Sequence, residues 1–401
     1  MSKSNHFFGQ SVFGQLVSLF DRVDISRAVK NHGSDYHCKG FSTWDHLVTM
    51  LFSSLANCNS LREIAAGFLG LKGKTEHLGL GKLPKRSTLS DANKHRTPLV
   101  FEEIYKKLLV QHRDSISDSR LKNKFKKEVN IIDSTSITLF KDILKSVGRK
   151  PKSGKEKGGI KVHTVLNADE QVPNLVWFSD ASKNDIIFWE QINFKPGSLY
   201  VFDKGYVDHW RYDKLTKDDV FFVTRLKDNA CYEELEELEI DDKVDPGVMR
   251  DQWIELPLRE NGKIKGYTRV RRIAYWDDEN QRSFEFISNL AEIDPGQIAE
   301  LYKTRWKIEL LFKQLKQNFP LKYFLGDNEN AIVIQIWCSM IANLLLTIIK
   351  SKLKRGWSFS SLVSFARIHL FNYIHLINFL ENPEKDWENS EIFTAPTLFS
   401  G

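Results

Sequence analysis

The chain has 401 residues, of which 41% are hydrophobic and 27% charged, and its formal net charge is +6. These values are typical of a soluble globular protein that is long enough for two or three domains. Its four cysteines form no CxxC pair and no Cys/His group at zinc spacing, which argues against a structural zinc site and fits a reducing compartment.

Charge is distributed unevenly along the chain. Residues 121–161 contain twelve Lys or Arg against four Asp or Glu, and residues 228–245 contain one Lys against nine acids. A basic segment of this kind suggests a surface for a polyanion, with a separate acidic patch that is solubilising or regulatory. Each run is also compatible with an ordinary solvated face.

Residues 1–120 predict a helical N-terminal domain. Residues 41–68 carry apolar side chains at helical spacing, and Ser42 or Thr43 is a suitable N-cap. Residues 70–85 are rich in Gly, Lys and Pro, and they predict a loop.

A further helix is expected to begin at Ser87 or Thr88 and to be interrupted near Pro98. Three basic residues precede it: Lys82, Lys85 and Arg86. This pattern is compatible with a DNA-reading helix-turn-helix, and equally with an ordinary helix that follows a basic loop. The N-terminal domain is therefore expected to bind DNA, on the evidence of charge and helices alone.

Residues 121–385 have the pattern of an α/β domain. Short apolar runs predict five strands, with helical segments after the third and fourth: 129–133, 160–166, 172–179, 199–203 and 221–224. Asp133 and Asp203 each end one of these runs. The order of elements predicts a mixed α/β sheet, and residues 386–401 form a C-terminal tail.

A β-rich insertion is expected at about residues 228–290. Residues 251–259 and 266–276 alternate as strands do and are joined through Asn261-Gly262, a hairpin signal. Residues 283–288 predict one more strand before the helical segment near residue 300.

Four polar side chains follow at offsets 0, 3, 7 and 14: Tyr302, Arg305, Glu309 and Lys316. On one helix these offsets fall within an arc of roughly 60°. The opposite side is apolar and carries Leu301, Ile308, Leu311, Phe312, Leu315 and Phe319. The arrangement suits holding a metal beside a phosphate backbone. The alternative is a solvated helix surface that carries an ordinary i,i+4 ion pair between Arg305 and Glu309.

Residues 331–349 are apolar enough to be considered as a membrane span. Polar residues recur there every four positions, so a buried amphipathic core helix is favoured and no membrane association is expected. The first 15 residues lack a basic segment followed by an apolar run and predict no signal peptide.

Three acids stand out chemically: Asp133, Asp203 and Glu309. Converging carboxylates without thiol or imidazole ligands suit hard divalent ions such as Mg²⁺ or Mn²⁺. Two such ions can activate a nucleophilic oxygen and stabilise the leaving oxygen of a phosphodiester, while Arg305 and Lys316 neutralise backbone charge. An Asp at a strand end is, alternatively, an ordinary turn or helix cap.

The spacing of Tyr302, Arg305, Glu309 and Lys316 matches the Y-(2)-R-(3)-E-(6)-K motif. Residues 131–135 and 202–206 look like the two Asp motifs that accompany it. The chain thus resembles the DDE transposases of bacterial insertion sequences that move by cut-and-paste. Its N-terminal region, through residues 41–45 and 86–89, looks like the helical domain of unassigned function that is often attached to these enzymes.

The resemblance implies an RNase H-like core with a β insertion between the second Asp and the Glu. It implies that Asp133, Asp203 and Glu309 are catalytic and hold Mg²⁺ or Mn²⁺, as two ions. It makes Tyr302 and Arg305, together with Lys316, contacts to transposon-end DNA. The implied activity is cleavage at terminal inverted repeats and strand transfer into target DNA by a cytoplasmic protein that is a homodimer in the DNA complex.

Other assignments rest on weaker signals. From charge alone, a basic loop is a candidate for phosphate contacts through Arg149, Lys150, Lys152 and Lys161. Some members of the family stack a flipped base on a tryptophan of the insertion, for which Trp253 and Trp276 are candidates or else core residues. The alternative functions are a sequence-specific DNA-binding protein and a metal-dependent nuclease of the same fold without strand transfer.

Overall fold

The computed structural model describes residues 9–71, 73–117, 120–139, 158–240 and 246–385. The chain forms two compact units, one of residues 1–116 with 315–401 and the other of residues 117–314. The domain predicted for residues 121–385 includes residues 315–385, which the compact units group with residues 1–116 instead.

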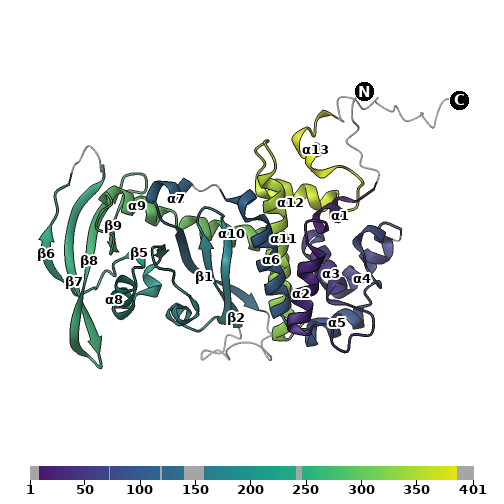
Figure 1. The fold of residues 1–401 in the computed structure, drawn as a ribbon, viewed down its shortest axis with the longest axis horizontal. Helices are drawn as coiled ribbons and strands as arrows, with labels where there is room; N and C mark the ends of the chain where they lie inside the picture. Colours follow the sequence, from purple (N-terminus) through teal and green to yellow (C-terminus); the bar gives the residue numbers. More distant parts are fainter. Residues whose placement is uncertain (1–8, 72, 118–119, 140–157, 241–245, 386–401) are drawn as a thin grey trace. The chain divides into compact units, whose positions relative to one another are not determined.

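The first unit contains helices and no strand among its described residues (Figure 1). Its long helix α11 (Glu329–Ser351) packs against four others that are far apart in the sequence. These are α3 (Thr43–Ala56), α5 (Arg86–His95), α6 (Leu99–Ile116) and α12 (Phe359–Ile368). The remaining helices of this unit are α1 (Val12–Val17), α2 (Arg22–His32), α4 (Leu61–Gly70), the 3-10 turn η1 (Glu76–Leu78) and α13 (Leu376–Glu381).

The N-terminal helix boundaries follow local capping chemistry. Ser42 caps α3, as predicted, in a capping box with Asp45. The interruption near Pro98 is confirmed, since α5 ends at His95 and α6 begins at Leu99. The prediction that Ser87 or Thr88 caps α5 was wrong, because the helix begins at Arg86 and its N-cap Lys85 makes no side-chain cap.

Helix α11 is a core helix, as expected. It is the only helix in the described parts of the chain that is long and apolar enough to cross a membrane, and 94% of its most apolar window is buried within the protein. Most of the polar residues that recur every four positions are buried as well. Gln335, Ser339 and Asn343 are buried, and the Gln335 amide bonds the carbonyls of Pro320 and Tyr323 at 2.6 and 2.8 Å. Internal hydrogen bonds thus replace solvation.

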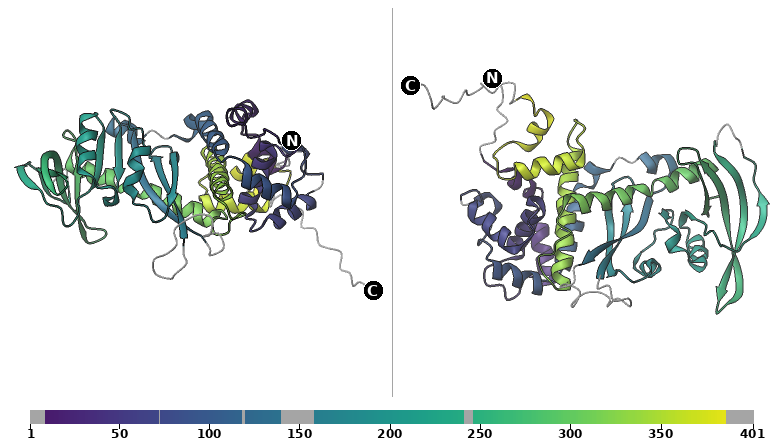
Figure 2. Two further views of the ribbon diagram at one scale, coloured as in Figure 1. Left: turned by 90° about the horizontal axis from the view of Figure 1, so that it is seen from below. Right: turned by 180° about the vertical axis from the view of Figure 1, so that it is seen from behind.

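The second unit is built on one mixed sheet (Figure 2). Its nine described strands run in the order β3-β2-β1-β4-β5-β9-β8-β7-β6. Strands β1, β4 and β5 are parallel, and all other neighbours are antiparallel. The core strands are β1 (Val129–Leu139), β2 (Gly158–Asn167), β3 (Val172–Asp180), β4 (Leu199–Phe202) and β5 (Phe221–Arg225). This arrangement confirms the expected mixed α/β fold with an RNase H-like core.

The β insertion extends the same sheet beyond β5. It consists of β6 (Glu233–Glu237), β7 (Val248–Glu260), β8 (Lys263–Asp277) and β9 (Arg282–Ser288). The predicted hairpin is present: Asn261 and Gly262 have φ values of 50° and 77°, which suit a tight two-residue turn between β7 and β8. Strand β9 then pairs with β5, so the insertion is hydrogen-bonded to the core.

Short helices complete this unit. They are α7 (Arg120–Phe125), η2 (Asp185–Gln191), η3 (Lys204–Tyr206), α8 (His209–Lys217) and α9 (Pro295–Lys303). Helix α8 packs against β5, β7 and β8. The segment predicted as a helix near 185–192 is thus a 3-10 helix.

The predicted single helix through residues 302–316 was wrong. The chain forms α9 and then α10 (Trp306–Asn318), with a break at Thr304 and Arg305. The Thr304 hydroxyl donates to the carbonyl of Leu301 at 2.6 Å, and Arg305 N–H bonds the carbonyl of Tyr302 at 3.0 Å. These i,i−3 bonds tighten the backbone at the junction. The six apolar residues predicted for the opposite side are nevertheless all buried.

Candidate active site

Two of the predicted acids emerge side by side from neighbouring parallel strands. The register pairs Ile132 with Phe202, so Asp133 and Asp203 are the next residues on β1 and after β4. Asp203 follows the end of its strand, as predicted. Asp133 does not, because β1 continues to Leu139 through its pairing with β2.

Backbone amides orient both carboxylates. Asp133 Oδ1 accepts from the N–H of Ser134 at 2.7 Å, and Asp203 Oδ1 accepts from the N–H of Gly205 at 2.7 Å. The second bond also caps the η3 turn, so the alternative role of Asp203 as a cap is present in the same geometry. A cap of this kind leaves the other carboxylate oxygen for a further contact.

Arg305 joins Asp133 to Glu309. Its Nη1 donates to Asp133 Oδ2 at 2.9 Å, and its Nη2 donates to Glu309 Oε1 in an i,i+4 ion pair. The side chains of Arg305 and Asp133 are each 16% exposed, and that of Glu309 is 36% exposed. The simple surface pair considered from the sequence is therefore part of a largely buried bridge to the sheet.

The electrostatics of Asp133 reflect this crowding. Burial raises its pKa to about 6, against the opposing influence of the Ser134 N–H and of Arg305. The charges of Asp203 and Glu309 raise the pKa of Asp133 further. The three acids therefore share one electrostatic environment, in which negative charge is incompletely balanced.

Tyr302 and Arg305 lie together on the wall of a pocket of about 570 Å³. The Tyr302 ring packs on Phe286 with a centroid distance of 4.9 Å, and the Arg305 guanidinium lies 5.7 Å from the Tyr302 ring centre. The other lining residues come from β5, β8, β9, the turn between β8 and β9, and α9; they include further cations, aromatic rings and two acids: Arg225, Tyr275, Arg282, Phe284 and Lys303, with Asp277 and Glu279. Trp306, which is 60% exposed, completes the wall. The pocket combines aromatic rings with cations.

The two candidate tryptophans lie in different surroundings. Trp253 is half-buried, and the guanidinium of Arg269 lies 4.6 Å from its ring centre. Trp276 is 37% exposed and stands between Tyr275 and Asp277, which both line the pocket. Trp306 was not considered from the sequence, although its position beside Arg305 in the motif was a signal for it.

The other predicted contacts differ in their surroundings. Lys316 follows Glu309 by seven residues on α10, which is close to two helical turns, and burial lowers its pKa. Lys161 is only 12% exposed, pairs with Asp185 Oδ1 at 3.2 Å and donates to the carbonyl of Lys183 at 2.7 Å. Arg149, Lys150 and Lys152 lie outside the described residues.

No pattern in the sequence indicated a polar group next to Ser134, the residue that follows Asp133. Asp185, at the start of η2, accepts from the Ser134 hydroxyl at 2.5 Å as well as from Lys161. His163 is fully buried, with Nε2 2.8 Å from the Ser179 hydroxyl and Nδ1 3.8 Å from Asp185. Burial lowers the pKa of His163 to about 4, so it is a neutral structural residue.

The donor set can be tested against a divalent cation. In the parts of the chain that are described, no three His, Cys, Asp or Glu side chains meet closely enough to hold an ion as they stand. Arg305 lies between two of the acids, Asp133 and Glu309. Carboxylate oxygens are nevertheless the ligands that Mg²⁺ and Mn²⁺ prefer, and the raised pKa of Asp133 marks a site that a further cation would stabilise. The residues fit such an ion.

Comparison with known proteins gives the wider context. A family model described as "Transposase DDE domain" matches residues 124–345, and a domain of unknown function (DUF4372) matches residues 8–81. The chain is 32% identical over 269 residues to a putative transposase of Sinorhizobium fredii, covering 66% of this chain and 71% of that protein.

Two further similarities are with proteins of insertion sequences. A probable transposase of Geobacillus stearothermophilus is 26% identical and covers 61% of this chain and 63% of its own length. A putative transposase of Synechocystis is 28% identical, with 70% and 74% covered. Among solved structures, a piggyBac transposase synaptic complex with hairpin DNA has a TM-score of 0.41 at 10% identity, covering 96% of this chain and 81% of that one.

Proposed function

The chain belongs to the DDE transposase family, whose members are enzymes that act on DNA, and we propose that Asp133, Asp203 and Glu309 are its catalytic carboxylates. The observation that supports this most strongly is the convergence of two strand-derived acids and one helix acid around Arg305. Arg305, which joins Asp133 to Glu309, lies 172 residues after Asp133 in the sequence.

The family uses divalent metal, and these three carboxylates would hold it as two Mg²⁺ or Mn²⁺ ions. Bound there, the ions supply a nucleophilic oxygen at neutral pH and stabilise the charge on the leaving oxygen of a phosphodiester.

The residues of the chain itself position the acids. The Ser134 and Gly205 amides hold one oxygen of each Asp, and so fix the direction in which the other oxygen points. The Arg305 guanidinium keeps Asp133 and Glu309 together and balances part of their charge. Phosphoryl transfer depends chiefly on such positioning and charge neutralisation.

The pocket beside Arg305 is the proposed site for transposon-end DNA. Tyr302 and Arg305 line it directly, with Arg225, Arg282 and Lys303 as further cations for phosphates. Aromatic side chains on the same wall suit contact with an unpaired base. Trp253 and Trp276 of the insertion stay proposed candidates for this role, and the tryptophan that lines the pocket is Trp306. Lys316 is proposed as a further DNA contact from the motif.

Two chemical steps follow. Water attacks the phosphorus at the transposon end, the P–O bond to the 3′ oxygen breaks, and that oxygen leaves as a 3′-OH. This hydroxyl then attacks a phosphodiester of target DNA, forming a new P–O bond while the target strand's own 3′ oxygen leaves. The first step hydrolyses an ester bond and the second exchanges one ester bond for another, and neither step needs a redox partner.

The wider organisation is part of the same proposal. Residues 1–120 form a DNA-binding domain, and residues 121–385 form the catalytic domain with its insertion at about 228–290. The protein binds terminal inverted repeats as a homodimer in the cytoplasm, with the basic loop that contains Arg149, Lys150 and Lys152 as an added phosphate contact.

The test uses purified protein, Mg²⁺, a labelled duplex that carries the element's terminal repeat, and plasmid as target. We expect cleavage at the repeat and joining to the plasmid, with both activities lost in Glu309→Gln. Binding without cleavage by the intact protein would contradict the enzymatic assignment and support the DNA-binding alternative. Cleavage without joining would support the nuclease alternative.

A further inference from the structure

A second cationic pocket lies in the first unit. Part of its lining belongs to residues 8–81, which match the domain of unknown function, and the rest to α5 and the residues beside it. Its volume is about 670 Å³. One side is lined by the turn after α2, residues 34–41, and the other by α5 and the segment that leads into it. Three of its lining lysines are exposed: Lys39, Lys82 and Lys85. None of them forms an ion pair with any described residue.

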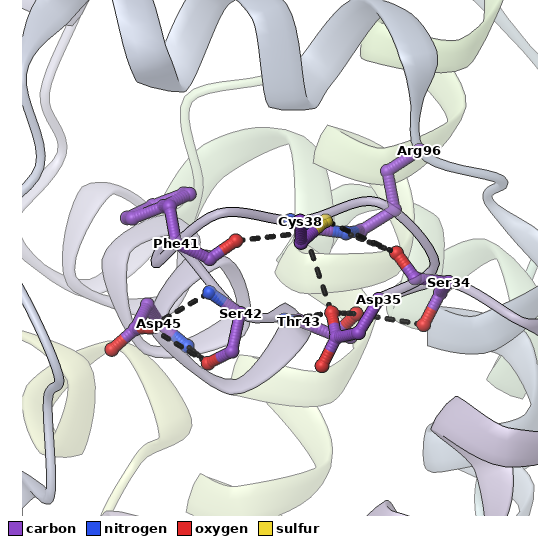
Figure 3. A network of polar contacts seen from close by, with 8 residues as sticks. All are labelled: Ser34, Asp35, Cys38, Phe41, Ser42, Thr43, Asp45 and Arg96. Atoms are coloured by element: carbon purple, nitrogen blue, oxygen red, sulfur yellow. Dashed lines mark hydrogen bonds and ion pairs between the residues drawn. The ribbon is translucent and has the colours of Figure 1, made fainter.

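One acid, Asp91, lines this pocket, against those three lysines and Arg96. Asp35 lies in the same turn and pairs with Arg96 Nη2 at 3.4 Å, so Asp35 and Asp91 offset two of these four cations. Asp35 Oδ1 accepts from the backbone N–H and hydroxyl of Thr43 at 2.6 and 2.7 Å, and Asp45 accepts from Ser42 (Figure 3). The pocket therefore has a clear excess of positive charge.

Arg96 forms the base of the pocket and fixes its shape. Its guanidinium donates to the carbonyls of Ser34 and Phe41 at 3.3 and 2.9 Å, and to Cys38 Sγ at 3.2 Å (Figure 3). The residue is only 6% exposed, yet its Nη1 has no hydrogen-bond partner. A buried guanidinium N–H without a partner is costly, and an anion seated in the pocket would supply the missing acceptor after a small adjustment.

The start of α5 adds to this preference for anions. Helix α5 has ten residues, and its N-cap Lys85 provides no side-chain acceptor for the first N–H groups. Uncapped N–H groups and the helix dipole favour a phosphate at such an end. Lys82 lies over the turn at Gly40, where a β-carbon would come within 2.8 Å of Lys82 Nζ. The two walls of the pocket are thus in close contact.

An aromatic side chain completes the pattern. Tyr36 is 79% exposed and packs on His37 with a centroid distance of 4.1 Å, beside the lysines. A single exposed ring is common on protein surfaces, but rings interleaved with cations are typical of surfaces that bind nucleic acid.

We propose that this pocket binds a phosphodiester of the DNA backbone, with Tyr36 packing on the adjoining sugar or base. The inference rests on the proposed function and adds a site to it. This part of the N-terminal region would then bind the phosphates of DNA. It is remote in sequence from the proposed catalytic acids. Phosphate could equally come from a free nucleotide, and the test separates the two sources.

The test measures binding of the full-length protein to a fluorescent terminal-repeat duplex as salt is varied. The double variant Lys82→Ala/Lys85→Ala should bind more weakly, and its slope of log K against log salt should fall by about 1 for each lysine. Lys94→Ala is the matched control, because Lys94 is an exposed lysine of α5 that does not line the pocket. Its affinity should remain closer to that of the intact protein.

Tyr36→Ala provides a second variant with a different signature. It should lower the affinity for DNA without changing the salt slope, because stacking releases no counterions. Both variants alter exposed side chains, so their unfolding transitions should match that of the intact protein.

The outcomes are separable from those of the catalytic assay. Equal DNA affinity and equal salt slope in the double variant and in Lys94→Ala would overturn the inference, even if the intact protein cleaves. If the double variant loses binding of ATP or pyrophosphate but binds DNA as the intact protein does, DNA is not the ligand of this pocket. Weaker DNA binding by the double variant, with normal DNA binding by Glu309→Gln, would support the pocket as a DNA site whether or not cleavage is detected.

Discussion

The guanidinium of Arg305 is hydrogen-bonded to Oδ2 of Asp133 at 2.9 Å, across 172 residues of sequence. The same guanidinium holds Glu309 one helical turn later. One side chain thus connects the central strand of the sheet to the helix that carries the third acid. This connection makes Arg305 a positioning residue for two of the proposed catalytic carboxylates.

Replacing Arg305 should cost both stability and activity. Arg305→Ala leaves Asp133, which is 16% exposed, without its cation, and we expect a loss of about 1–3 kcal/mol in the free energy of unfolding. Arg305→Lys keeps the charge but cannot hold two carboxylates in a fixed fork, so it should recover stability more than cleavage. Urea unfolding and the cleavage assay measure the two effects. An unchanged urea midpoint in Arg305→Ala would show that the bridge is dispensable.

Removing the metal should separate chemistry from binding. Chelation with EDTA is expected to abolish cleavage while the repeat duplex stays bound, because the proposed phosphate contacts are made by protein cations. Asp203→Asn should weaken Mn²⁺ binding, measured by calorimetry, by about tenfold or more. Unchanged Mn²⁺ affinity in this variant would remove Asp203 from the site.

Stability should depend on two buried histidines below neutral pH. Burial lowers the pKa of His46 to about 3 and that of His163 to about 4, from the ordinary 6.5. The unfolded chain therefore binds two protons between pH 6.5 and about 4 that the folded chain excludes. The free energy of unfolding is therefore unaffected by these two residues above pH 6.5. Below that pH it falls by about 1.4 kcal/mol per pH unit for each residue.

This dependence is measured by urea unfolding at several pH values. His163→Gln should remove about half of the acid-side slope that these two residues contribute, whereas the exposed His77→Gln should leave it unchanged. An unaltered slope in His163→Gln would mean that the imidazole is protonated in the folded protein.

Lys161 should behave as a structural residue. Because its ammonium group pairs with Asp185 and bonds a backbone carbonyl, Lys161→Met is expected to lower the free energy of unfolding by about 1–2 kcal/mol. The salt slope of DNA binding should not change. A slope reduced by about 1 with unchanged stability would instead restore Lys161 as the phosphate contact proposed from the sequence.

Gln335 should be among the most sensitive positions of the helical unit. Its amide bonds the carbonyls of Pro320 and Tyr323 and the N–H of Leu325, and all of these contacts are at least partly buried. Gln335→Ala leaves three backbone groups unpaired, and we expect a loss of about 3 kcal/mol or more in thermal or urea unfolding. Thr347→Ala, on the same helix, should cost less than about 1 kcal/mol, since the hydroxyl bonds only the carbonyl one turn earlier.

Local signals were sufficient for many elements. The N-cap at Ser42, the interruption near Pro98 and the Asn261-Gly262 hairpin each depend on a few adjacent residues, and all are present. Apolar residues at helical spacing likewise identified the buried side of α10 and the core helix α11. Such patterns are readable because they depend on short-range geometry and on the period of burial.

Other features depended on contacts that no local pattern contains. The break at Thr304 divides a sequence whose spacing fits one continuous helix, and β1 continues past Asp133 because β2 pairs along its full length. Lys161 looked like a free cation until the fold placed Asp185 beside it.

The sequence by itself indicated the family, singled out the three acids as candidates and predicted most of the strands, because spacing and side-chain chemistry are properties of the linear chain. Only the tertiary structure decided that Asp133 and Asp203 lie side by side, that Arg305 bridges two acids, and that the turn after α2 meets the start of α5 in a cationic pocket. Those relationships join segments far apart in the sequence, and they arise only when sheet register and helix packing bring the segments together.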